Sequence, residues 1–161
     1  MTMTLHSTAF ENGHQIPQRY TGEGDDVSPL LTWQCVPQAA HELALICEDP
    51  DAPTPEPWVH WLIYNLPADT SSLPEQVSRD AQLQSPVKAC QGCNSWPEGE
   101  NLGYLGPMPP PGHGLHHYHF TLYALRSQLN LPPGVQKAQL LAAMHDHVLA
   151  TASIVGTYER R

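Results

Sequence analysis

The chain has 161 residues, with 7 lysine and arginine residues against 16 aspartate and glutamate residues, a formal net charge of -9. This length fits one compact domain, so we expect residues 1–161 to hold a single site rather than a cleft between two domains. The acidic balance lacks the positive field that binding a phosphate backbone requires. Nucleic acid is therefore not an expected partner.

The sequence shows no targeting signal and no disulfide framework. The opening residues MTMTLHSTAF have no basic segment followed by an apolar run, and no apolar run approaches the roughly 20 residues of a membrane helix. We expect a cytoplasmic protein without stable membrane insertion. The four cysteines, at 35, 47, 90 and 93, are too few for a disulfide scaffold. Seventeen prolines and only 14% charged residues argue against a helical bundle.

Short segments between prolines and glycines predict a mostly β protein. The expected strands, in chain order, are 31–36, 42–49, 59–66 and 116–125. In the second of these, Leu43, Leu45 and Cys47 alternate with Ala44 and Ile46. Both faces of that strand are apolar, which predicts a central position in a sheet.

The C-terminal quarter contains the only helical pattern. Apolar residues at helical spacing after Gly134 predict a helix over about 136–149, and the β-type residues of 152–160 predict a last strand. The acidic stretch 23–26, EGDD, is expected to be a solvated turn. The architecture indicated is an antiparallel sheet or sandwich with one helix near the C-terminus.

A stiff, acidic connection links two of the expected strands. Asp49 and Asp51 lie in the sequence EDPDAPTPEPWVHW, in which prolines fix the backbone and the chain returns to a strand at His60. Rigidity at the end of central strands suits a preformed binding site. The alternative is that the two aspartates simply form an Asx-type turn.

Four histidines occur within seven residues of the sequence GHGLHHYHF. The strand period of two places His116 on one face with Tyr118, and places His117 and His119 on the other. His113 belongs to a glycine turn. The four side chains are therefore not expected to converge, and His116 and Tyr118 should lie where a core-facing strand meets its loop.

Neither a zinc site nor a hydrolase site is supported by these residues. Cys90 and Cys93 supply one half of a zinc pattern, but the second half is missing, so no metal or other cofactor is expected. A hydrolase lacks support because no G-x-S-x-G sequence occurs and Ser28 precedes a proline.

The remaining possibility is a small oxyanion site. Two histidines, a tyrosine hydroxyl and the backbone N–H groups of glycine-rich turns can all donate hydrogen bonds to an anion. An aspartate in such a site is expected to orient a neighbouring histidine and to favour its protonated form, rather than to touch the anion.

Two long motifs carry a family resemblance. DPDAP followed by WVHW, and later GYLGPMPPPGHGLHHYHFTLYAL, resemble the two signature regions of the phosphatidylethanolamine-binding protein family, also called Raf kinase inhibitor-like proteins. VSPLLTW near the start and ATASIVGTYER at the end are similar to its bacterial branch, so the resemblance spans nearly the whole chain. It departs from the family at His117, where many members carry arginine, and at CQGC.

The resemblance implies a single domain with a large antiparallel sheet and a smaller second sheet, and a pocket for phosphate-like headgroups. Carried over by position, the ligand-binding residues are Asp49, His60, Gly106, Met108, Pro110, His116 and Tyr118, with Asp51 and Trp58 shaping the loop. No catalytic residue is implied.

The function expected from this sequence is non-enzymatic binding of a small anion or a phosphorylated headgroup, with regulation of a partner protein as a further role that the sequence leaves open. The alternative is an inhibitor that acts on a kinase or protease through protein contacts, and a metal-dependent hydrolase ranks below both. A homodimer is expected from the family resemblance and from the sheet edges that a mostly β domain exposes.

Overall fold

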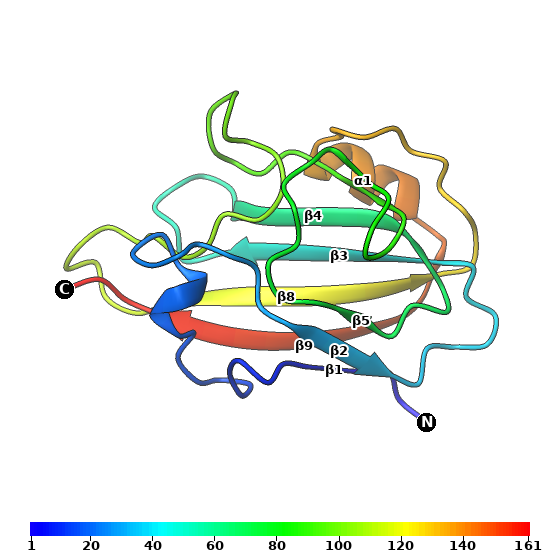
Figure 1. Cartoon of the computed structure of the whole chain (residues 1–161), viewed down its shortest axis with the longest axis horizontal. Coiled ribbons are helices and arrows are strands. Elements are labelled where there is room, and N and C mark those ends of the chain that lie inside the picture. The colour runs from blue at the N-terminus through cyan, green and yellow to red at the C-terminus, as the bar shows by residue number, and fades with distance from the viewer.

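Two antiparallel sheets and one short helix make up the fold, as seen in a computed structural model that describes all 161 residues (Figure 1). The small sheet has the strand order β1-β2-β5, and the large sheet has the order β6-β7-β4-β3-β8-β9. The strands are β1 Thr4–His6, β2 Leu31–Gln34, β3 Glu42–Asp49, β4 Trp58–Pro67, β5 Ser72–Leu73, β6 Gln82–Leu83, β7 Ala89–Gln91, β8 His116–Leu125 and β9 Val148–Tyr158. The mostly β class with a large and a small sheet is as predicted.

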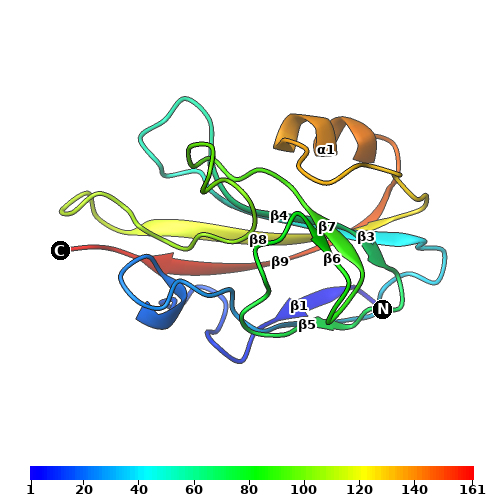
Figure 2. The same cartoon turned by 45° about the horizontal axis from the view of Figure 1, so that its top comes forward.

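The two faces of the large sheet are covered by different elements (Figure 2). On one face, Leu43 and Leu45 of β3 pack in a core that includes residues of the small sheet. On the other face, Ala44 and Ile46 pack with Leu140 of the helix α1, Lys137–Met144. Alternate residues of β3 therefore belong to two separate buried clusters, one on each face of the sheet. This agrees with the central position predicted from its two apolar faces.

The helix is shorter than predicted. It ends at Met144 because His145 has a non-helical backbone and Asp146 adopts a left-handed conformation, with φ of 65°. The last strand then begins at Val148, inside the range predicted as helix, and continues to Tyr158. With α1 eight residues long, no helix in the chain has the length and apolar character needed to cross a membrane.

Strand limits elsewhere differ by smaller amounts. The strand predicted over 31–36 ends at Gln34, because Cys35 turns the chain with φ of 63°. The strand predicted over 59–66 extends by one residue at each end. The short strands β1, β5, β6 and β7 have two or three residues each, too few for a period of two to be recognised in the sequence.

Candidate ligand-binding site

The end of β3 and the starts of β4 and β8 lie side by side at one end of the strands of the large sheet, next to the loops at the left of Figure 1. In the antiparallel register, Asp49 at the end of β3 pairs with Trp58 at the start of β4, and Glu48 pairs with His119 of β8. A cavity of about 250 Å³ opens at these strand ends. Its walls are formed by Asp49, Ala52, Pro53, Thr54, Trp58, His60, Trp96, Met108, Pro109, Pro110, His116 and Tyr118.

Asp49 and His116 form a buried hydrogen-bonded pair. His116 Nδ1 lies 2.6 Å from Asp49 Oδ2, and the two side chains are 2% and 5% exposed. The other oxygen of the carboxylate, Asp49 Oδ1, accepts the backbone N–H of Asp51 at 2.8 Å. Asp49 thus makes an Asx-type turn and orients a histidine at the same time, so both sequence interpretations describe it.

His116 is also linked to the protein surface. Its Nε2 lies 2.6 Å from Nδ1 of His113, whose side chain is exposed on the turn between Gly112 and Gly114. Two nitrogens at this distance share one proton, so His113, His116 and Asp49 form a relay from solvent to the cavity wall. The sequence had placed His113 apart from His116, because the strand period gives no information about a turn.

Asp51 and His117 form a second pair near the same strand ends, with both side chains exposed to solvent. The Asp51 carboxylate accepts hydrogen bonds from both the backbone N–H and the Nδ1 of His117, each at 2.8 Å. Although partial burial opposes it, these bonds lower the pKa of Asp51. The pair holds the loop after β3 against the start of β8, and His117 faces away from the cavity as the strand period predicted.

His60 is an acceptor, not a cation, at neutral pH. Its Nδ1 donates to the carbonyl of Leu105 at 2.7 Å, so the neutral ring carries its proton there and leaves Nε2 as a lone pair. Burial lowers the pKa of His60 to about 4. The ring packs edge-on against Trp96 and Tyr118, with centroids 5.1 Å away in both cases.

Tyr118 contributes a hydroxyl that has no hydrogen-bond partner within the protein. The residue is 1% exposed and its ring lines the cavity. Burial raises the pKa of this hydroxyl, so it keeps its proton and remains available as a donor. The cavity therefore offers one neutral donor and one neutral acceptor beside the Asp49–His116 pair.

The proline-rich turn contributes side chains more than N–H groups. Met108 and Pro110 line the cavity, whereas Gly106 lines a neighbouring hollow. The N–H of Gly106 already donates to Asp26 Oδ1 at 2.7 Å. Because prolines occupy 107, 109, 110 and 111, only Met108 is left with an unpaired N–H in this turn.

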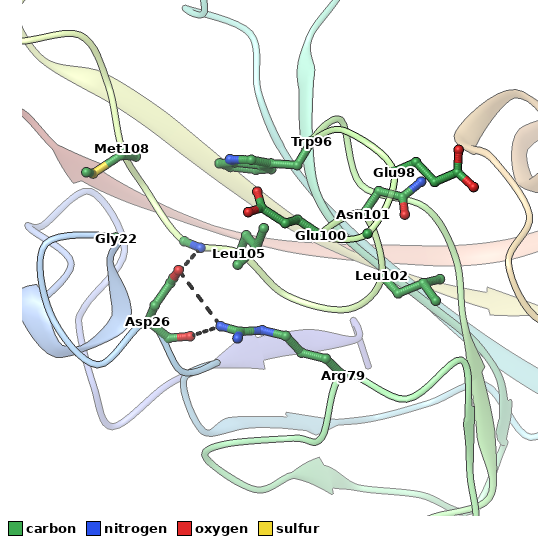
Figure 3. Close-up of a pocket in the computed structure, with 12 residues that line it drawn as sticks. Gly22, Asp26, Arg79, Trp96, Glu98, Glu100, Asn101, Leu102, Leu105 and Met108 are labelled. Carbon is green, nitrogen blue, oxygen red and sulfur yellow. Dashed lines mark hydrogen bonds and ion pairs between the residues drawn. The ribbon is translucent and has the colours of Figure 1, made fainter.

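A larger hollow, of about 960 Å³, adjoins the cavity and shares Trp96 and Met108 with it (Figure 3). Polar side chains line it, including Asp26, Arg79 and Glu100. The stretch EGDD was expected to be solvated, but its last residue accepts a hydrogen bond from Gly106 and forms an ion pair with Arg79, with 3.8 Å between the charged atoms. Trp96 was also missed, since a tryptophan in a loop has no periodic signal.

A large antiparallel sheet, covered by a small sheet on one face and a helix on the other, carries a small cavity where β3 ends and β4 and β8 begin. The class that this architecture defines is a mostly β protein of two antiparallel sheets and one short helix.

The chain belongs to the phosphatidylethanolamine-binding protein family, whose model matches residues 6–159. It is 46% identical to a UPF0098 protein of the archaeon Methanothermobacter thermautotrophicus, over 98% of this chain and 99% of the relative. A UPF0098 protein of Chlamydia trachomatis is 41% identical over 98% and 99% of the two chains. The resemblance found in the two long motifs is therefore confirmed at the level of the family.

Two solved structures resemble the whole chain. One is described as a phosphatidylethanolamine-binding protein homologue, CT736, from Chlamydia trachomatis, with a TM-score of 0.86, 40% identity and 99% of each chain covered. The other is YbcL of Escherichia coli, described as a member of the mammalian PEBP family, with a TM-score of 0.88, 31% identity and full coverage of both chains. These likenesses agree with the fold and with a bacterial and archaeal branch.

Proposed function

We propose that this protein binds a small oxyanion, inorganic phosphate or the phosphoryl part of a phosphorylated headgroup, without transforming it. The observation that carries the proposal is the pair formed by Asp49 and His116, 2.6 Å apart in the wall of a 250 Å³ cavity. The carboxylate orients the imidazole in the cavity wall, and a positive charge on that ring would attract an anion even though both ring nitrogens already have hydrogen-bond partners.

The size of the cavity supports a headgroup rather than a large ligand. Pockets for drug-sized molecules run from roughly 300 to 1,000 Å³. At about 250 Å³ this one falls just below that range. A phosphoryl group with a short substituent would fill it, and the rest of a longer ligand would extend through the shared wall of Trp96 and Met108 or into solvent.

The polar atoms in the wall favour a phosphate that keeps one proton. Tyr118 can donate to a phosphate oxygen, and the lone pair on His60 Nε2 can accept from a P–OH group. A protonated His116 would supply the positive charge. A fully ionised anion would meet the lone pair of His60 unfavourably, so a form that carries at least one proton should be preferred.

The hydroxyl groups in the cavity favour binding over catalysis. Besides Tyr118, Thr54 is the one lining residue with a hydroxyl, and that hydroxyl donates to the carbonyl of Glu56 at 2.6 Å. It has no basic partner that would make it a nucleophile. The arrangement is consistent with a ligand that enters and leaves unchanged.

Calorimetric titration at neutral pH tests the proposal. Phosphate, phosphoethanolamine and phosphoserine serve as probes, because they distinguish free phosphate, a lipid headgroup and a phosphorylated protein side chain as sources of the same group. We expect saturable binding by the wild type and about tenfold or greater weakening in His116→Ala, with His119→Ala as the control on the opposite face of β8. Equal weak heats in all three proteins would refute the proposal.

A further inference from the structure

Leu105 is the residue that fixes the orientation of His60. Its carbonyl accepts the Nδ1 proton of His60 at 2.7 Å, and its N–H donates to the backbone carbonyl of His60 at 3.1 Å. The first of these bonds decides which ring nitrogen carries the proton, and the second holds the two backbone segments together. If the carbonyl of Leu105 moved away, Nε2 could be protonated instead, and the cavity would gain a donor where it now has an acceptor.

Asp26 holds the peptide group between Leu105 and Gly106. The Asp26 carboxylate accepts the N–H of Gly106 at 2.7 Å. Because the carbonyl of Leu105 belongs to the same planar peptide group, this bond also fixes the direction of that carbonyl. Figure 3 shows Asp26 below and to the left of Leu105, with dashed lines joining it to Arg79. A displacement of Asp26 would therefore be transmitted to His60 through one rigid amide.

Arg79 completes the clamp from the neighbouring loop. Its Nε donates to the carbonyl of Tyr104 at 2.8 Å, and its guanidinium donates to the backbone carbonyl of Asp26 and forms an ion pair with the Asp26 carboxylate. One side chain thus joins the backbone of both segments. The charge of Asp26 is balanced, although its side chain is only 24% exposed.

The segment that contains Tyr20 and Asp26 lies in unusually close contact with the segment that contains Leu105 and Gly106. A Cβ at Gly106 would lie 2.1 Å from the carbonyl oxygen of Tyr20, so only glycine fits there. Asp26 has φ of 57°, a left-handed conformation that costs energy for any residue other than glycine, although aspartate and asparagine tolerate it best. A residue kept in such a conformation within a tight contact suggests a specific task.

We propose that Asp26 is a positioning residue that fixes the tautomer of His60 by holding the Leu105–Gly106 peptide. The consequence for the ligand rests on the proposed function, because the Nε2 lone pair selects for an oxyanion that carries a proton. The effect on the imidazole itself does not depend on any ligand. The inference and the proposed function can therefore fail separately.

The test combines nitrogen NMR of the imidazole rings with calorimetric titration of inorganic phosphate, both at pH 7. In Asp26→Gly the left-handed backbone is retained and the acceptor for Gly106 is lost. We expect His60 to change from a single form protonated at Nδ1 to a mixture of tautomers, and phosphate affinity to fall about fivefold, the size of one hydrogen bond. Asp26→Asn keeps an acceptor oxygen and should restore both readouts.

Two further variants keep the result interpretable. Asp146→Gly is the matched control, since Asp146 is also an aspartate with positive φ but lies exposed beyond α1. Arg79→Met removes the links to Tyr104 and Asp26 from a half-exposed position, and it should shift the His60 tautomer in the same direction if Asp26→Gly does not fold. His60 remaining protonated only at Nδ1 in Asp26→Gly, or in Arg79→Met where Asp26→Gly does not fold, would overturn the proposal, whatever the phosphate affinity of the wild type.

Discussion

The strand β3 has a buried carboxylate at each end, and the two behave differently. Glu42 begins the strand with 7% of its surface exposed, and Asp49 ends it with 3% exposed. Asp49 uses both oxygens, on a histidine and on a backbone N–H, and lines the ligand cavity. Glu42 accepts one backbone N–H, from Leu129 at 3.2 Å, and burial raises its pKa.

Burial alone therefore does not identify a functional acid in this protein. Glu42 ties the loop before α1 to the sheet and lines neither of the two cavities described above. Asp49 differs because its partner is a titratable ring that continues by a hydrogen bond to the surface residue His113. The partners of a buried acid, more than its depth, indicate what it does.

Neutralising the acid at each end should separate the two roles most clearly. In Asp49→Asn, His116 loses the carboxylate that orients it, and we expect phosphate affinity to fall at least about tenfold and stability by roughly 1–3 kcal/mol. In Glu42→Gln, affinity should stay at the wild-type value. Calorimetric titration and urea unfolding measure the two effects. Tighter binding by Asp49→Asn would mean that the carboxylate repels the anion directly.

His60 should make the cavity end sensitive to acid. Its pKa is about 4 in the folded protein and about 6.5 in an unfolded chain, so the unfolded state binds more protons between these values. Stability should therefore fall as pH decreases from about 6.5 to 4, by roughly 3 kcal/mol in total. Urea unfolding across this range should reveal a dependence that His60→Asn removes. An equal slope in the variant would assign it to other groups.

Much of the fold could be predicted because its central strands follow a simple rule. The alternation of Leu43 and Leu45 with Ala44 and Ile46 requires two buried faces, and the structure provides them. The limits of α1 could not be predicted in the same way. Its end depends on a left-handed Asp146, and the apolar spacing continues past it into β9.

The strand period places His116 and Tyr118 on one face of β8, and the family resemblance, not the period, joins Asp49 and His60 to them. All four line one cavity because β3 ends where the paired β4 and the neighbouring β8 begin. Trp96, His113 and Asp26 come from loops, where contacts are set by tertiary packing. The presence of prolines in the turn did suggest rigidity, but not that Gly106 would donate its N–H to Asp26.

The relay through His113 predicts a moderate effect on anion binding. In His113→Ala, Nε2 of His116 loses its hydrogen-bond partner, so the buried ring is held less firmly in the cavity wall. Calorimetric titration of inorganic phosphate at pH 7 measures the effect. We expect about threefold weaker binding by the variant. Equal affinities in the two proteins would contradict a role for His113 at the site.

The smallest expected effect on the free energy of unfolding comes from Glu42, at the other end of β3. Its contribution to stability falls as pH rises, whereas that of His60 increases. Because burial raises the pKa of Glu42, the folded state favours its protonated form, and this contribution is lost as pH rises through the folded pKa. Glu42→Gln, which is always neutral, should therefore gain stability relative to the wild type between pH 4 and 7, by less than about 1 kcal/mol. Urea unfolding at both pH values measures the difference. A constant difference would mean that Glu42 is solvated well enough to ionise freely, and the contrast with Asp49 would then rest on exposure as well as on partners.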